Sequence, residues 1–287
     1  MGGLQIGWPG VNDKESVDAL EAAFEAGINV FDTADSYGKG HSERLIGETF
    51  KGRREKIIIS SKVGMVDDPA KLKLDFSPQH IVEGCEASLK RLQTDYLDIY
   101  LLHLILDKHP LTEETKGALE GLKKAGKVRH FGVSVQFLHQ AAEQLDKGFG
   151  DSMMIEYSPL KRKGVAEILD RAKAQGVGVI TRGALEKGML SGKYAVGHRF
   201  DKQDVRTRIP VEYIDRLLRN VQIMKERAAK EGWSMLGMAL AFQLAQPGCS
   251  TITIGLKTRK QVEENVRALA ETRAHDWDQI ISELERN

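Results

Sequence analysis

The chain has 287 residues, of which 41% are hydrophobic and 29% charged. These values are typical of a soluble globular protein with enough apolar content for a sizeable core. The formal charge of +1 gives no global field to attract nucleic acid or an anionic membrane, so we expect neither as a partner. The chain has no apolar run long enough to span a bilayer and only two cysteines, Cys85 and Cys249, which favours a cytoplasmic location.

Short β-branched runs alternate with amphipathic helical stretches, a pattern that predicts βαβ units and a parallel sheet. The expected strands are Asn29–Asp32, Lys56–Lys62, Leu97–His103, His130–Ser134, Ser152–Glu156, Gly178–Arg182 and Thr251–Ile254. The expected helices are Glu15–Ala26, Ser42–Phe50, Pro78–Leu92, Thr112–Ala125, Phe137–Lys147, Val165–Ala174, Pro210–Glu231, Ser234–Gln246 and Thr258–Ala268. Regular spacing of this kind indicates one repeated βα architecture.

Seven expected strands are one fewer than a closed parallel barrel normally has. The deficit lies at the start, where Met1–Asn12 is Gly-rich and leads directly into a helix. No internal repeat or linker separates a second domain, so residues 1–287 are interpreted as a single domain. The predicted fold class is therefore α/β, a (β/α)8 TIM barrel whose first strand is missing or truncated.

Polar side chains stand at the carboxyl ends of three expected strands, where parallel barrels carry their functional groups. Asp32, Lys62 and His103 each end a strand, and Tyr37 lies in the loop after the first. A lysine on an apolar strand needs a counter-charge, and Asp32 is the nearest candidate. Such a pair favours ionisation of a neighbouring phenol, so Tyr37 can give a proton to a carbonyl oxygen that His103 orients.

Each of these four residues also has an ordinary structural interpretation. Asp32 can cap a turn, and Tyr37 can be a half-buried loop aromatic. Lys62 can extend its amine out of the core, and His103 can be a hydrogen-bonded core histidine. For any one residue alone the structural interpretation is the more frequent, but their coincidence at three successive strand ends favours a shared function.

A second candidate site follows the last expected strand. Lys257, Arg259 and Lys260 surround the start of the helix that begins near Thr258. Positive side chains at a helix N-terminus suit a phosphate, and barrels often bind phosphates after their last strands. A solvated basic turn is the alternative that charge alone leaves open. Lys193, in a Ser-Gly-Lys-Tyr segment, is a further candidate for a pyrophosphate.

Several segments together resemble the signature of the aldo-keto reductase family. They are Asp32-Thr-Ala-Asp-Ser-Tyr37-Gly, Ser-Lys62, Asp98-Ile-Tyr-Leu-Leu-His103, Gly126-Lys-Val-Arg-His-Phe-Gly-Val-Ser134, Glu156-Tyr-Ser-Pro, Gly188-Met-Leu-Ser-Gly-Lys193-Tyr and the stretch from Gly255 to Asn265. Any one of them is a weak signal. Together they follow the family's order along nearly the whole chain, which makes the set specific.

This resemblance implies an NADP(H)-dependent oxidoreductase that reduces a small aldehyde or ketone, or oxidises the alcohol, without a metal. It implies that Tyr37 is the general acid/base, that Asp32 and Lys62 tune it, and that His103 orients the substrate. The implied cofactor-binding residues are Ser134, Arg182, Gly183, Leu185, Lys193, Arg206, Gly255, Lys257, Thr258, Arg259, Gln261, Glu264 and Asn265.

Three positions depart from the common family pattern. Val135 stands where the family often has Asn, and Met154 stands where it often has Gln. Both usual residues bond the nicotinamide carboxamide, so Ser134 has less help here. Arg182 stands where an aromatic residue is common, and a planar guanidinium also stacks on a π face. We therefore expect Arg182 to pack against the nicotinamide.

Two other functions stay open at this level. Barrels of this type also serve as non-catalytic nicotinamide-sensing modules, and only turnover separates the two. A lyase that uses Lys62 as a Schiff-base amine is the other alternative, because one barrel fold hosts many chemistries. The substrate is not predicted, because loops around Val66–Phe76, Leu104–Leu111 and Tyr194–Ile209 would select it.

Overall fold

The computed structural model describes residues 12–66, 73–107, 109, 111–202, 204–272 and 277–285. Apart from Asn12, the expected N-terminal loop lies outside this range. The main sheet of the described residues is parallel and has the order β1-β2-β5-β6-β7-β8-β9. Its strands are β1 (Val30–Asp32), β2 (Ile58–Val63), β5 (Leu97–Ile105), β6 (Val128–Val135), β7 (Ser152–Glu156), β8 (Gly178–Arg182) and β9 (Thr251–Ile252). All seven expected strands are confirmed.

Ten α-helices occur in the described part of the chain. They are α1 (Asp13–Glu25), α2 (His41–Thr49), α3 (Pro78–Leu92), α4 (Glu113–Lys124), α5 (Leu138–Asp146), α6 (Val165–Ala174), α7 (Val211–Lys230), α8 (Met235–Leu244), α9 (Arg259–Ala270) and α10 (Asp278–Glu285). The nine expected helices are among them. Side-chain caps explain several of the starts: Asn12, Ser77, Thr112, Ser234 and Thr258 each accept a bond from a first-turn N–H.

Elements that the pattern did not predict are all short. A two-stranded hairpin, β3 (Met65–Val66) with β4 (Lys73–Leu74), follows β2 within one of the expected mouth loops. Helix α10 and the 3₁₀ turns η2 (Arg54–Lys56), η3 (Glu186–Ser191) and η4 (Val205–Arg208) were also unforeseen. Segments of this length carry too few periods of hydrophobic residues to be recognised. None of the described helices is both long and apolar enough to cross a membrane.

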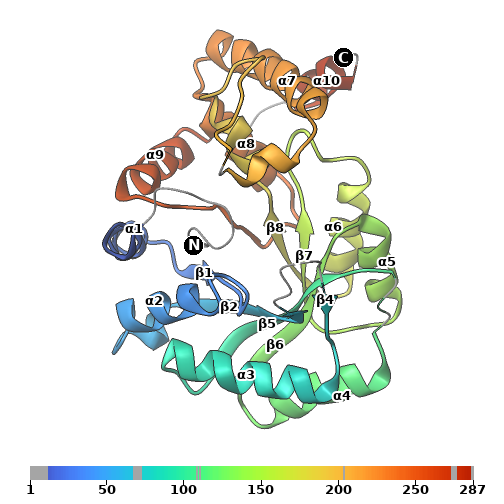
Figure 1. Cartoon of the computed structure of the whole chain (residues 1–287). Coiled ribbons are helices and arrows are strands. Elements are labelled where there is room, and N and C mark those ends of the chain that lie inside the picture. The colour runs from blue at the N-terminus through green and yellow to red at the C-terminus, as the bar shows by residue number, and fades with distance from the viewer. Residues whose placement is uncertain are drawn as a thin grey trace.

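The sheet is curled, with helices along its outer side (Figure 1). Among the described residues, β1 pairs only with β2 and β9 only with β8, so the strands do not close into a ring. Helices α1 and α9 lie side by side across this opening (Figure 1), joined by ion pairs from Arg259 to Asp18 and Glu25. The predicted α/β barrel class is therefore confirmed, with seven strands in the main sheet of the described residues.

The two faces of the sheet bury different sets of side chains. Because strand residues alternate between faces, one set points outward to the helices and forms the main core, with Ile59 and Tyr100 among its most buried members. The other set points into the barrel, where Leu101, Met154 and Ile180 form a small separate apolar cluster. This cluster is the floor beneath the carboxyl ends of the strands.

A second apolar core lies beside the barrel, where α7, α8 and α10 pack together (Figure 1). Its buried members include Leu218, Met238 and Ile280, and Trp277 packs against it. Helix α8 is apolar on nearly all sides because it lies between this core and the sheet. This packing explains why α10 forms although it has only eight residues.

At the amino-terminal end of the strands, Asp98 holds two arginines. Its Oδ2 accepts from Arg54 Nη2 at 2.6 Å and its Oδ1 accepts from Arg129 Nη1 at 2.8 Å. The backbone N–H of Ile59 also donates to Asp98, at 2.9 Å. Both guanidinium groups stack on Tyr96, at 4.0 and 4.1 Å from its ring centroid. The cluster links η2, β5 and β6 far from the carboxyl ends of the strands.

Replacement of Asp98 by Asn should therefore reduce stability. The change keeps the shape of the side chain but leaves two arginines without their buried counter-charge, which costs about 2–3 kcal/mol in the free energy of unfolding. Urea unfolding followed by circular dichroism measures this loss. A change below about 0.5 kcal/mol, the range of an ordinary surface substitution, would contradict the structural role.

Candidate functional site

Asp32 and Lys62 form a buried ion pair on the inner wall of the barrel. Lys62 Nζ donates to the two carboxylate oxygens of Asp32 at 2.7 and 2.6 Å, and to the carbonyl oxygen of Thr33 at 2.6 Å. An ammonium group has three donors, so these partners use them all. Ser60 Oγ also donates to Asp32, at 2.9 Å. The lysine side chain is 1% exposed, so water does not replace these partners.

The charge state of Lys62 follows from these contacts. Burial, the largest influence, opposes the charged ammonium, but the carboxylate of Asp32, with a contribution from the ionised form of Tyr37, outweighs it. The net result is a pKa for Lys62 above its ordinary value. Lys62 therefore remains a cation throughout the neutral pH range.

Tyr37 lies beside this cation, as predicted. Its loop follows β1, and its carbonyl oxygen accepts from the N–H of Ser42 at 3.2 Å, which ties the loop to the start of α2. Lys62 Nζ lies 5.3 Å from the centroid of the Tyr37 ring. The ring of His103 meets Tyr37 edge-on, with centroids 5.7 Å apart and planes at 76°. The four predicted residues are therefore gathered at one place.

A β-bulge sets the position of His103. The pairing of β5 with β6 shifts register between Leu102 and Ile105, and Leu104 has a left-handed φ of +60°. An extra residue in one strand re-aims its neighbours, and here the bulge lies at the histidine. Its Nδ1 is 3.5 Å from Ser36 Oγ.

His103 is neutral in this environment. Burial, then the positive charges of Lys62 and Arg182, lower the pKa of His103 to about 3. Only the neutral imidazole is therefore present at physiological pH, with one N–H to donate. A neutral donor polarises a carbonyl oxygen without competing with Tyr37 for the role of acid.

Next to the four residues, β6 and β8 contribute further inward positions. Ser134 is buried opposite Met154 in the register of β6 and β7. The guanidinium of Arg182, at the end of β8, donates from Nη2 to the carbonyl oxygen of Val135 at 3.1 Å. Met154 fills the apolar floor, where Gln would have offered an amide. Arg182 therefore reaches from the end of β8 to the end of β6, and its side chain is 27% exposed.

A further charged cluster beside Arg182 was missed by the sequence analysis. Lys161 Nζ donates to Glu156 Oε1 at 2.8 Å and lies 3.7 Å from Glu186 Oε2, while Arg182 Nη1 is 3.9 Å from Glu156. Burial opposes ionisation of Glu156, but Lys161 and Arg182 outweigh it and leave the pKa of Glu156 below its ordinary value. Glu156 therefore offsets part of the positive charge at the mouth.

The predicted phosphate region at the start of α9 is partly occupied by its own contacts. Thr258 caps the helix and accepts from the N–H of Gln261 at 3.3 Å, while Gln261 Oε1 accepts from the N–H of Lys257 at 2.8 Å. Arg259 Nε donates to Asp18 at 2.9 Å and its Nη1 donates to Glu25 at 3.1 Å. Arg259 therefore faces α1, and a phosphate would compete with two carboxylates.

Lys257 and Arg206 lie close enough beside the start of α9 for each charge to act on the other. Burial, then the like charge of Arg206, lower the pKa of Lys257, and only Asp204 opposes them. Arg206 is held by Asp204 through two bonds of 2.9 and 2.6 Å and donates to Tyr194 at 3.1 Å. Lys193 lies 4.0 Å from Glu264. Because the positive charges of Lys257 and Arg206 repel each other, an anion bound beside both of them would be stabilised.

The remaining predicted cofactor residues differ in exposure. Gly255 is exposed with open space around its α-carbon, while Asn265 is buried in α9. Gly183 has a φ of +74°, and its α-carbon faces Glu156, so a side chain there would be strained. Leu185 is half-buried against the second core. The thirteen predicted cofactor residues thus come from β6, β8, η4, α9 and the loops after β8 and β9.

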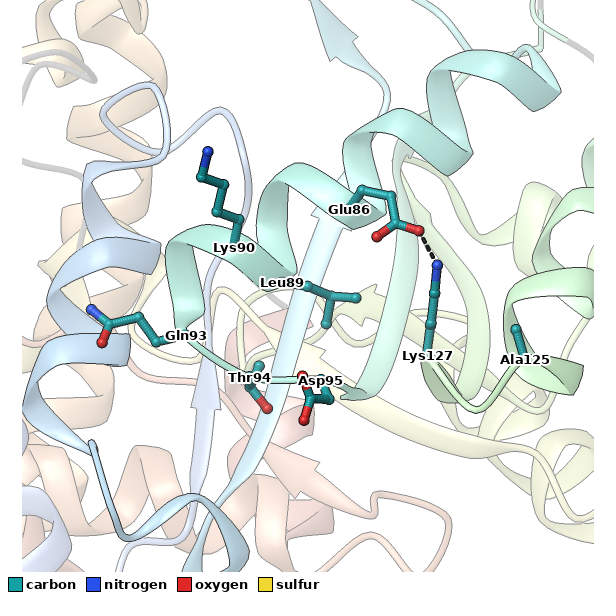
Figure 2. Close-up of a pocket in the computed structure, with 8 residues that line it drawn as sticks. All are labelled: Glu86, Leu89, Lys90, Gln93, Thr94, Asp95, Ala125 and Lys127. Atoms are coloured by element: carbon teal, nitrogen blue, oxygen red, sulfur yellow. Dashed lines mark hydrogen bonds and ion pairs between the residues drawn. The ribbon is translucent and has the colours of Figure 1, made fainter.

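A surface hollow lies at the opposite end of the strands (Figure 2). It is lined by Glu86, Leu89, Lys90, Gln93, Thr94, Asp95, Ala125 and Lys127. Lys127 and Glu86 form an ion pair at its edge (Figure 2). Because these residues precede β5 and β6, the hollow is separated from His103 and Ser134 by the length of those strands. The hollow is therefore not part of the candidate site that Tyr37, Lys62 and His103 form at the carboxyl ends of the strands.

A buried polar layer behind Tyr37 was also missed. Glu43 pairs with Arg91, 48 residues away, and no local signal predicts such a contact. Asp35 lies within the Asp32–Tyr37 segment, but its loop position gave no sign of burial. Among the described residues its Oδ1 has no hydrogen-bond partner. The Glu43–Arg91 pair and the burial of Asp35 therefore become visible only in the three-dimensional structure.

Comparison with known proteins identifies the family of this chain. A sequence model described as Aldo/keto reductase family matches residues 1–284. Aldo-keto reductase YhdN of Bacillus subtilis (strain 168) is 31% identical over 269 residues, which cover 89% of this chain and 79% of that protein. A probable voltage-gated potassium channel subunit beta of Oryza sativa subsp. japonica is 31% identical over 271 residues, covering 89% and 82%.

Among solved structures, the holo form of aldo-keto reductase AKR11C1 from Bacillus halodurans is similar with a TM-score of 0.78 and 29% identity, covering 98% of this chain and 90% of that chain. The chain therefore belongs to the aldo/keto reductase family, and the resemblance seen in its sequence is confirmed. This is a family of oxidoreductases that act on carbonyl or alcohol substrates and generally use a nicotinamide cofactor.

Asp35 makes stability depend on pH. Burial, then the Glu43 carboxylate, raise its pKa from 3.8 to about 7. As pH rises between these values, the unfolded chain releases this proton while the folded chain keeps it, so the contribution of Asp35 to stability is lost. Asp35→Asn stays neutral. Its melting temperature relative to wild type should rise from pH 4 to 7 and then level off; a constant difference would contradict the assignment.

Proposed function

We propose that this protein is a cytoplasmic NADP(H)-dependent reductase of small aldehydes or ketones, which also runs the reverse oxidation, and that residues 1–287 act as one domain. One observation carries the proposal: the buried, charged Lys62 lies 5.3 Å from the centroid of the Tyr37 ring, and the ring of a neutral His103 lies 5.7 Å from the same ring. An acid, its cationic neighbour and a neutral donor are the groups that carbonyl reduction requires.

The roles follow from the charges of these residues. The cofactor supplies the hydride when bound. As charge develops on the carbonyl oxygen, the neutral imidazole of His103 donates a hydrogen bond to it and the hydroxyl of Tyr37 gives it a proton. The nearby ammonium of Lys62 stabilises the phenolate that remains, and Asp32 keeps that ammonium in place and ionised. In the oxidation direction, the same phenolate takes the proton from the alcohol.

Residues on β6, β8, η4, α9 and the loop before α9 fit a nicotinamide dinucleotide. Ser134 offers a buried hydroxyl for the carboxamide, and the guanidinium of Arg182, whose side chain is 27% exposed, offers a planar surface for the ring. Lys257 and Arg206 provide the concentrated positive charge that a phosphate neutralises. Arg259 favours a 2′-phosphate, and hence NADP(H), because its bonds to Asp18 and Glu25 are exposed ion pairs that contribute little and open easily.

The lyase alternative is disfavoured by the state of Lys62. A Schiff base forms from a neutral amine, which requires a lowered pKa, whereas the pKa of Lys62 is raised and its three donors are used. A non-catalytic sensing module is the second candidate function. The similarity to a plant protein named as a probable channel subunit favours it, and turnover distinguishes the two.

Tyr37→Phe tests the proposal directly. The change removes only the hydroxyl, so NADPH binding should persist while turnover of small aldehydes falls by about 10²–10⁴-fold, the usual contribution of general acid catalysis. Cofactor binding is measured by fluorescence titration with NADPH and, in parallel, NADH; turnover is followed by NADPH absorbance. Unchanged turnover in the variant would contradict the role of Tyr37, and wild type that binds NADPH without turnover would support the sensing module.

A further inference from the structure

A buried ion pair lies directly behind the wall that carries Lys62 and Tyr37. Glu43, in the first turn of α2, is 0% exposed, and its Oε2 accepts from Arg91 Nε at 2.6 Å. Arg91 lies in the last turn of α3 and also donates from Nη2 to Ser88 at 3.1 Å. A carboxylate without access to water needs such partners, because its desolvation is costly.

The first arm of the pair reaches the strand of Lys62. Ser61 Oγ donates to the other carboxylate oxygen of Glu43 at 2.6 Å. Ser61 immediately precedes Lys62 on β2, and neighbouring strand residues point to opposite faces. Glu43 therefore anchors the outer face of β2 at the point where Lys62 leaves the inner face.

The second arm reaches the loop of Tyr37. Gly40 directly precedes α2 and has a φ of +78°; a β-carbon there would lie only 2.3 Å from Arg91 Cδ, so the arginine packs directly on this glycine. The next residues bind the loop: Ser42 donates its N–H to the carbonyl oxygen of Tyr37 at 3.2 Å, and Thr33 Oγ1 donates to Ser42 Oγ at 2.9 Å. The ion pair thus holds the segment that carries Tyr37.

Stability alone gives a weak reason for this arrangement. A buried ion pair often contributes no more than apolar residues of the same volume, because desolvation offsets the attraction. Its value lies in fixed geometry, since reacting groups must be held within about 0.5 Å of their productive positions. Glu43 contacts both the strand of Lys62, through Ser61, and the arginine that packs on the Tyr37 loop.

We propose that Glu43 and Arg91 are positioning residues that fix Tyr37 relative to Lys62 for proton transfer. This inference rests on the proposed function. Neither residue touches the substrate region in this arrangement; both act through β2 and the loop from Thr33 to Ser42. Loss of the pair should therefore slow the chemical step and leave the binding of cofactor and substrate almost unchanged.

Glu43→Gln is the informative variant, because it keeps the shape of the side chain and weakens its charge-assisted bonds to Arg91 and Ser61. A displacement of the acid should lower kcat by about ten- to hundredfold, while the KM for a small aldehyde and the Kd for NADPH change less than about twofold. Asp98→Asn is the matched control: it disrupts a buried ion pair at the opposite end of the same strands. Its kcat should equal that of wild type at a temperature where both variants are folded.

A double-mutant cycle with Tyr37→Phe separates positioning from general damage. If Glu43 acts through the Tyr37 hydroxyl, adding Glu43→Gln to Tyr37→Phe should cause no further loss of the residual turnover. Multiplying losses would overturn the inference, as would a Glu43→Gln variant with normal kcat. If Glu43→Gln does not fold, Arg91→Lys enters the same cycle, since it keeps the charge and loses the bond geometry. Absence of turnover in wild type would instead overturn the proposed function, and this inference with it.

Discussion

The contact between Asp32 and Lys62 is the constraint on which the rest of the site depends. A lysine that is 1% exposed must have a counter-charge, and Asp32 provides both carboxylate oxygens within 2.7 Å. The two residues come from adjacent strands, so parallel pairing of β1 with β2 is needed to bring them together. The ammonium held in this way lies beside the ring of Tyr37, and its positive charge helps to lower the pKa of His103.

His103 shows how the same charge acts on a neighbour. An exposed histidine titrates near neutrality, but burial together with Lys62 and Arg182 keeps this one uncharged at all physiological pH values. The bulge in β5 and the left-handed Leu104 place the ring of His103 close to the positive charges of Lys62 and Arg182. The backbone distortion thus sets the position of the His103 ring, and the neighbouring charges set its protonation state.

Local pattern was sufficient for much of the fold. Alternation located the strands that end at Asp32, Lys62 and His103, and helical periodicity located the helices between them. The four catalytic candidates could be collected because parallel strands bring their carboxyl ends together. Short elements escaped, because the β3–β4 hairpin and α10 offer only a few residues each and gain their stability from packing.

Contacts between distant segments were beyond the reach of such reasoning. The basic residues at the start of α9 were predicted from charge, but the carboxylates of α1 that hold Arg259 lie more than 230 residues away. The pair of Arg206 with Asp204 is local, but it lies in a turn that has no periodic signature. The pair of Glu43 with Arg91 depends on how α2 and α3 pack on the sheet, which no segment encodes alone.

The most direct test of the central claim is the transfer of deuterium from NADPH labelled with deuterium at both C4 positions of the nicotinamide. Wild-type protein incubated with a small aldehyde should give an alcohol with one deuterium on the former carbonyl carbon, measured by mass spectrometry. That result would establish direct hydride transfer at this site. An unlabelled product, or none while the protein binds NADPH, would contradict an oxidoreductase built around Tyr37 and Lys62.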